Sequence, residues 1–181
     1  MIRAALFSLA LLATPAFAQE DHADEHHEEH EHEEHEEHEH EDGEHDEHLA
    51  EANGIRAIHA WANATDASSA LVYVDIENTS ADLVTLIGAE TEIATSIEIV
   101  GLENTAGELT YTAIPALPIP AGADMVFAPN GLAIALTGLT TPLVEGEHFD
   151  LELEFDGFHL DLEVEIESAT ATQHSHAGHN H

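Results

Sequence analysis

The chain has 181 residues, a length that suits one domain with flanking segments, and it contains 38 acidic residues but only two basic ones. A formal net charge of −36 repels nucleic acid and anionic membrane surfaces, so the composition excludes both as electrostatic partners. Metal cations are the ligands that such a charge attracts.

Residues 1–18 have the pattern of a secretory signal peptide. Arg3 supplies a positive charge, an apolar run extends from residue 4 to residue 13, and Ala16 and Ala18 form a small-residue cleavage site. The run is shorter than the ~20 apolar residues that a membrane-spanning helix needs. We therefore expect a cleaved signal peptide and a periplasmic mature protein. The sequence has no Cys, so stability must come from a hydrophobic core.

Residues 19–53 form an acidic, histidine-rich segment. From Glu20 to His48 it holds 17 acidic residues and ten histidines, with no apolar face on which a helix could pack. We expect this segment to be disordered without metal. A solvated acidic run is the plain alternative, but solubility alone does not explain ten histidines. Imidazole nitrogen suits Zn(II) and Cu(II), so the candidate ligands are His22, His26, His27, His30, His32, His35, His38, His40, His45 and His48.

Residues 54–170 form the part of the chain that can fold by burying a core. Alternating and β-branched stretches recur between turn signals, which predicts about seven to nine short strands. The clearest is the hairpin from His148 to Glu167, where apolar residues alternate with acids on both sides of a turn at Asp156-Gly157. The pattern is typical of an all-β, antiparallel β-sandwich with Greek-key connections.

Three stretches of this region resemble a known family: "IHAWANAT", "ALVYVDIENTSADLVTLIGAE" and "LPIPAGADMVFAPNGLAIALTGLTTPLVEGEHFDLELEF". The third contains the turn residues that frame the periplasmic copper chaperones of the PCu(A)C type. The sequence resembles that family over most of residues 55–168. The resemblance implies a cupredoxin-like β-sandwich and the handling of copper outside the cytoplasm.

The copper ligands of the resembled family are missing from the corresponding positions. The family's His, Met, His and Met fall on Val100, Tyr111, Ala133 and Ala135, with the spacing preserved. Cu(I) prefers thioether and thiolate ligands, and Met125 is the only methionine or cysteine after the predicted signal peptide. We therefore expect the fold to be kept and the family's Cu(I) site to be lost. The four replacements would leave an apolar patch on the sandwich rim.

Residues 171–181, ATQHSHAGHNH, form a second histidine-rich segment. The histidine spacing of i, i+2, i+5 and i+7 lets a flexible chain wrap one ion. The segment is similar to the C-terminal extension with which some members of the resembled family bind Cu(II). An accidental tract or an expression tag is the alternative, although the irregular spacing is unlike a tag. The candidate ligands are His174, His176, His179 and His181.

Three further histidines lie in the region expected to fold. His59 stands near Trp61 in a predicted strand, and we expect it to pack or to face solvent and not to bind metal. His148 and His159 lie on the two strands of the last predicted hairpin, where both should face the polar side. A shared surface metal site between them is a minor alternative.

The sequence has no Gly-x-Ser-x-Gly turn, no phosphate-binding loop and no cysteine nucleophile, so we expect no enzyme. The leading hypothesis is a periplasmic, copper-chaperone-like protein whose histidine-rich tails bind Cu(II) and/or Zn(II) and buffer or deliver it. Its protein partner would be a membrane metal transporter or a cytochrome oxidase assembly factor. Two alternatives are a zinc-uptake accessory protein and a metal-independent docking or assembly module that uses the sandwich surface.

Overall fold

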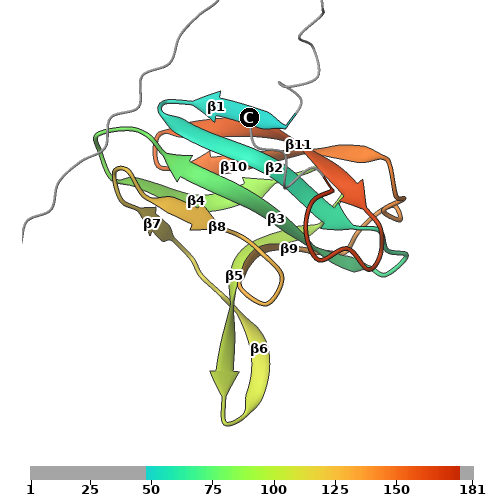
Figure 1. The fold of residues 1–181 in the computed structure, drawn as a ribbon. Coiled ribbons are helices and arrows are strands. Elements are labelled where there is room, and N and C mark those ends of the chain that lie inside the picture. Colours follow the sequence, from blue (N-terminus) through green and yellow to red (C-terminus); the bar gives the residue numbers. More distant parts are fainter. Residues whose placement is uncertain (1–47, 176–181) are drawn as a thin grey trace, which may run out of the picture. The chain divides into compact units, whose positions relative to one another are not determined.

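The computed structural model describes residues 48–175, which contain eleven β-strands and no helix (Figure 1). The strands are β1 (Leu49–Ala52), β2 (Ile55–Asn63), β3 (Ser69–Asn78), β4 (Val84–Glu90), β5 (Ser96–Thr105), β6 (Glu108–Ala113), β7 (Leu117–Ile119), β8 (Asp124–Val126), β9 (Leu132–Thr137), β10 (His148–Phe155) and β11 (Phe158–Glu167). This architecture confirms the all-β prediction. Within the described residues, no helix is long and apolar enough to cross a membrane.

The hairpin of β10 and β11 shows how the alternating pattern becomes structure. Its apolar residues pair across the two strands and point into the core, while most of the acids between them face outward. Gly157, at a φ of 105°, closes the turn after Asp156, as the Asp-Gly signal predicts. The buried residues are Phe149, Leu151, Leu153, Phe155, Leu160, Leu162, Val164 and Ile166. One face of the hairpin is therefore core, and the other is a row of carboxylates.

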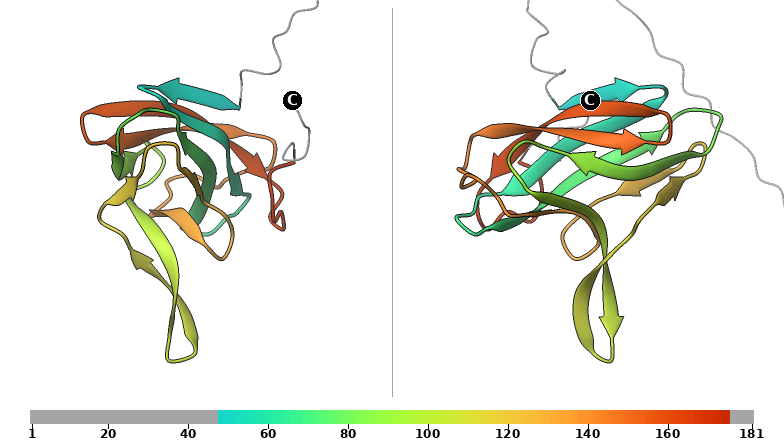
Figure 2. Two further views of the ribbon diagram at one scale, coloured as in Figure 1. Left: turned by 60° about the vertical axis from the view of Figure 1, so that its left-hand side comes forward. Right: turned by 180° about the vertical axis from the view of Figure 1, so that it is seen from behind.

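The strand pairings run through one continuous sheet in the order β6-β5-β9-β3-β2-β11-β10-β4-β7, with β1 attached to β2 and β8 to β3. All pairings between these strands are antiparallel except that of β11 with β2, which is parallel and sets Glu165 beside Trp61. The predicted antiparallel arrangement therefore holds for every pair of these strands except this one. Because β10 occupies one edge of β11, the other edge is left to pair with β2, and the two strands run in the same direction. The hairpin of β5 and β6 projects away from the rest of the sheet (Figures 1 and 2).

Two apolar clusters hold the sheet together. The main core collects residues from β2, β3, β4, β9, β10 and β11, of which Ile55, Val72, Ile76, Leu86, Ile134, Leu136, Leu153 and Val164 are among the fully buried ones. A smaller cluster contains Trp61, Tyr73, Val100 and Ala133. β2 contributes to both clusters and lies in the middle of the strand order.

The folded region extends beyond the boundaries that composition suggested. β1 lies within residues 19–53, which we expected to be disordered, and it pairs with β2 from Leu49 opposite Ile58 to Ala52 opposite Ile55. The beginning of the predicted C-terminal tail is also ordered, because His174 is buried. Residues 1–47 and 176–181, with the predicted signal peptide and most of both histidine-rich segments, lie outside the described residues.

Candidate metal site

Two polar side chains are buried among the described residues, those of Asn78 and His174. The Asn78 amide donates hydrogen bonds to three backbone carbonyls and so holds a turn. His174 is 1% exposed, and its Nε2 atom lies 2.9 Å from the Oε2 atom of Glu165. A buried imidazole that meets a carboxylate is a candidate metal ligand, because histidines that bind metal commonly hydrogen-bond to a carboxylate.

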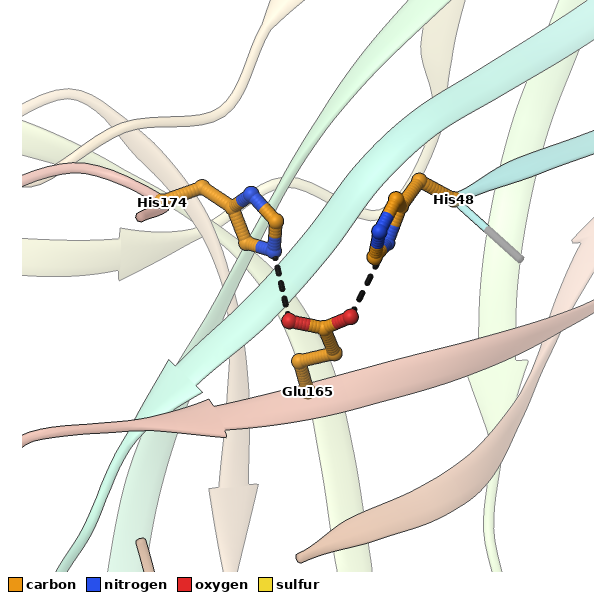
Figure 3. A group of neighbouring side chains, drawn as sticks. All are labelled: His48, Glu165 and His174. Atoms are coloured by element: carbon orange, nitrogen blue, oxygen red, sulfur yellow. Dashed lines mark hydrogen bonds and ion pairs between the residues drawn. The ribbon is translucent and has the colours of Figure 1, made fainter. Parts of the chain in front are cut away.

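Glu165 connects His174 to a second imidazole (Figure 3). The other carboxylate oxygen, Oε1, lies 2.9 Å from the Nδ1 atom of His48. One ligand atom from each of these three residues lies within 4.8 Å of the other two. A second carboxylate, that of Glu167, lies 3.8 Å from His174 Nε2. Side chains from three parts of the chain thus converge on one small volume.

Strand alternation places Glu165 at this position. Val164 and Ile166 point into the main core, so the carboxylate between them faces outward, where β11 runs beside β2. His48 directly precedes β1, and the pairing of β1 with β2 holds that end of the chain near β11. The site is therefore anchored on regular sheet structure and does not depend on loops alone.

The chain after β11 folds back toward β2 and is fixed by hydrogen bonds. The side-chain amide of Asn63 donates to the backbone carbonyls of Ser168 and Ala171, at 2.9 and 3.0 Å. Further along, the backbone N–H of Ser175 donates to Glu167 Oε1 at 2.7 Å. These bonds hold the segment on both sides of the buried imidazole.

A third imidazole lies beside this pair. The ring centre of His59 on β2 is 5.2 Å from that of His174 and 5.9 Å from that of His48. The backbone N–H of His59 donates to the carbonyl oxygen of His48 at 2.9 Å. The neighbourhood of Glu165 therefore contains three imidazole rings.

The donor atoms of the site are nitrogen and oxygen, which suit Zn(II) and Cu(II). Met125, the one methionine in the described residues, lies on β8 and packs against the main core. Beside His48 the surface is hollowed over a volume of about 320 Å³, and Asp161 and Glu163 are among the residues that line the hollow. Carboxylates in such a position attract cations. The residues present thus fit a divalent metal ion, and one of them, His48, also lines the hollow.

Two of the fourteen ligands predicted from sequence meet in this site, His48 and His174. We predicted them as members of separate segments, and the structure joins the inner ends of those segments. The other twelve candidates lie outside the described residues: His22, His26, His27, His30, His32, His35, His38, His40, His45, His176, His179 and His181.

Glu165 was not among the predicted ligands. Three other acids, Asp161, Glu163 and Glu167, share its alternation along β11, so periodicity does not single it out. Glu165 lies 2.9 Å from both His48 and His174, and these two contacts result from the topology of the fold, which periodicity does not reveal.

The minor alternative, a metal site shared by His148 and His159, is wrong. His148 lies opposite Glu165 near one end of the hairpin, and His159 lies opposite Glu154 near the other. Each has its own carboxylate neighbour: His148 Nε2 is 3.6 Å from Glu163, and His159 Nδ1 is 2.9 Å from Glu152. The polar orientation of both residues is as predicted, but the register keeps them apart.

The four positions that correspond to the copper ligands of the resembled family lie together in the smaller cluster. Val100 and Ala133 are buried register partners on β5 and β9, and Tyr111 and Ala135 are half-buried beside them. Trp61 packs in the same cluster, with its ring centre 4.7 Å from that of Tyr73.

The interior of this cluster is apolar. Burial, together with the neighbouring Tyr111, raises the pKa of Tyr73. The expected exposed patch is therefore wrong for Val100 and Ala133, which are buried. Trp61 is also the register partner of Glu165, so the candidate metal site lies on the strands next to this cluster.

Comparison with known proteins concerns the family and the fold of this chain. Residues 55–167 match the family model described as LpqE-like, a family named for a lipoprotein. A relative from Leifsonia xyli subsp. xyli (strain CTCB07), named as lipoprotein Lxx21020, is 28% identical over 106 residues. The match covers 58% of this chain and 64% of that relative, so the chain spans less than two thirds of the relative's length.

Solved structures show the same fold. The apo PCuAC domain of PmoF2 superimposes with a TM-score of 0.59 at 19% identity, covering 70% of this chain and 99% of that domain. The solution structure of Cu(I)-bound DR1885 from Deinococcus radiodurans gives a TM-score of 0.52 at 26% identity, covering 61% of this chain and 76% of that one. These likenesses confirm the predicted cupredoxin-like fold and the resemblance to PCuAC domains.

Proposed function

The chain belongs to the LpqE-like family, and on that premise we propose that it is an exported metal-binding protein that takes up Cu(II) or Zn(II) and buffers it or delivers it. The observation that carries the proposal is the meeting of His48, Glu165 and His174 in one site. Two imidazoles and a carboxylate are a ligand set that both ions accept. The proposed activity is binding and transfer, without a catalytic step.

Copper is the first candidate for the cargo. Solved relatives in the same fold are described as copper-bound, one of them as a Cu(I) form. This chain offers nitrogen and oxygen atoms where Cu(I) would prefer sulfur, so we propose the oxidised ion, Cu(II). Zn(II) is the second candidate, because the same ligands suit it equally well, and a zinc-uptake accessory role would follow.

The histidine-rich segments support a role in collecting metal. The last histidine of the N-terminal segment is His48 and the first histidine of the C-terminal segment is His174, and both belong to the site. A metal ion bound in either segment is covalently tethered near the site, which raises its effective concentration there. We propose that these segments gather ions that the folded site then holds.

Export and the recipient are further parts of the proposal. The signal-peptide pattern of residues 1–18 and the name of the lipoprotein relative both support export to the periplasm. The recipient that we propose is a membrane metal transporter or a cytochrome oxidase assembly factor. The metal-independent docking module is less favoured, because Val100 and Ala133 are buried and do not form a docking patch.

The test separates the folded site from the terminal segments. In a full-length variant, here named the tail-silent protein, Gln replaces the twelve histidines outside residues 48–175. Calorimetric titration with Cu(II), Zn(II) and chelated Cu(I) should then show one equivalent of Cu(II) or Zn(II), while the unaltered chain takes up several. If the tail-silent protein bound less than one equivalent of either ion at neutral pH, the folded-site proposal would fail.

A further inference from the structure

We infer that His59 is a third imidazole ligand of the same ion, which makes the site a centre of three histidines and one glutamate. The inference rests on the proposed function and defines its metal site more closely. It contradicts the expectation from sequence, which placed His59 among packing or solvent-facing residues.

The backbone of β2 is bent to bring His59 to the site. Ile55 and Ala57 point into the main core, and regular alternation would send His59 after them. Instead, the pairing with β3 shifts register between Ile58 and Trp61, and Ala60 takes the next core position. His59 adopts a φ of 54°, in the left-handed region. This β-bulge turns the imidazole away from the core, toward the face that carries Glu165.

Bulges and left-handed non-glycine residues gather at functional sites, where they aim a side chain. The bulge at His59 is also tied to a ligand, because its N–H donates to the carbonyl oxygen of His48 at 2.9 Å. A displacement of either His48 or His59 would therefore displace the other. A backbone hydrogen bond thus links the proposed ligands His48 and His59 at the end of the pairing between β1 and β2.

The separations between the ring centres are close to those of three imidazoles around one ion, although His59 does not belong to the group whose ligand atoms all lie within 4.8 Å of one another. Imidazoles that bind a tetrahedral ion through nitrogens about 2.0 Å away place their ring centres roughly 5 Å apart. The three separations between His48, His59 and His174 are 5.9, 5.3 and 5.2 Å. Glu165, which contacts two of these rings, supplies the fourth donor. Four donors complete the coordination of Zn(II) and supply the equatorial plane of Cu(II).

The decisive experiment counts histidine ligands on Cu(II) in the tail-silent protein. One equivalent of Cu(II) is added, and electron spin-echo envelope modulation registers the remote nitrogens of the coordinated imidazoles. Three imidazoles are expected. The His59→Gly variant should show two, with an affinity for Cu(II) lower by at least about tenfold. Glycine suits a φ of 54°, so the variant should fold at least as well as its parent.

Two further variants separate ligation from a structural role. His59→Asn keeps a residue type that tolerates the left-handed conformation but has no imidazole, so it should also show two imidazoles. His159→Asn, far along the hairpin, should leave the count at three. If His59→Gly and His59→Asn retained three imidazoles, or the parent affinity, His59 would not be a ligand while the proposed function would stand. If the tail-silent parent bound no Cu(II) or Zn(II), both would fail.

Discussion

The imidazole rings of His48 and His174 have their centres 5.3 Å apart, although the two residues lie near opposite ends of the described chain. Glu165 contacts both of them, at 2.9 Å each. An ion bound here would therefore connect the start of β1, the first strand, to the segment that follows β11, the last strand. Metal binding and fold stability should be coupled for this reason, because the unfolded chain cannot present the same set of ligands.

The first prediction concerns this coupling. For the tail-silent protein, free Zn(II) at 100 times its Kd should raise the free energy of unfolding by about 2.7 kcal/mol. Glu165→Gln should remove most of this gain, because it removes the ligand between the two rings. Thermal unfolding followed by circular dichroism, with and without Zn(II), measures both effects. An equal gain in the Glu165→Gln variant would place the bound ion elsewhere.

The second prediction is that His48 and His174 act on one ion. Replacing either with Ala in the tail-silent protein should lower the affinity for Cu(II) by at least about tenfold. The affinity of the double variant for Cu(II) should fall by a factor smaller than the product of the two single factors. The reason is that the second ligand contributes little once the first has been removed. Competition titrations against a chelator give the four affinities. His159→Ala is the matched control and should change none of them.

The alternating sequence patterns predicted the fold class and most of the strands, but they indicated about seven to nine strands where the structure has eleven. They predicted most of the last hairpin residue by residue, since every apolar position of β10 and β11 is buried except Phe158 beside the turn, which is partly exposed. The pattern failed for β1, whose sequence Leu49-Ala50-Glu51-Ala52 is short and weakly apolar and sits directly after a long acidic run. Its place in the sheet depends on the partner strand β2, which composition does not reveal.

The site itself was only half predictable. Histidine content pointed to the two segments that contain His48 and His174, but not to their meeting, which results from contacts between distant parts of the chain. The bulge at His59 does leave a trace in the sequence. Core residues in β2 follow the spacing Ile55, Ala57, Ala60, so the alternation slips by one residue at this histidine. A slip of that kind is a sequence signal for a re-aimed side chain.

The third prediction concerns Asp75 on β3. Loss of hydration and, to a lesser extent, the negative charges of Glu77 and Asp124 raise the pKa of Asp75. A carboxyl group whose pKa is raised on folding contributes stability below its unfolded pKa and loses it as the pH rises through the folded pKa. Asp75→Asn should therefore stabilise the protein at pH 7, by less than about 1 kcal/mol because solvent screens the charges.

Urea unfolding of Asp75→Asn at several pH values tests this sign. The excess free energy of unfolding of Asp75→Asn over that of the unaltered protein should shrink as the pH falls toward 3.8, the ordinary pKa of an aspartate. Asp124→Asn should give a smaller gain at pH 7, and that gain should diminish further when Asp75 is already neutral. A destabilised Asp75→Asn variant at pH 7 would contradict the assigned charge repulsion.

The fourth prediction restores the ligands of the resembled family. Val100→His, Tyr111→Met, Ala133→His and Ala135→Met together place two imidazoles and two thioethers within the smaller cluster, where the four residues already pack. The combined variant should take Cu(I) from a chelator, because thioethers favour that oxidation state. It should also be less stable, by about 1–3 kcal/mol for each enlarged buried residue, since Ala133 is fully buried and a larger side chain there would overpack the cluster.

Chelator competition with Cu(I), carried out in the tail-silent protein, measures the gain in binding. A matched variant with only Val100→His and Ala133→His separates the effect of sulfur from that of imidazole, and it should gain much less. The site around Glu165 should keep its affinity for Cu(II) in every variant, because Trp61 and the β2–β11 pairing stand between the two positions. If the unaltered protein already took Cu(I) as tightly as the combined variant, then the apolar cluster would not mark a lost copper site.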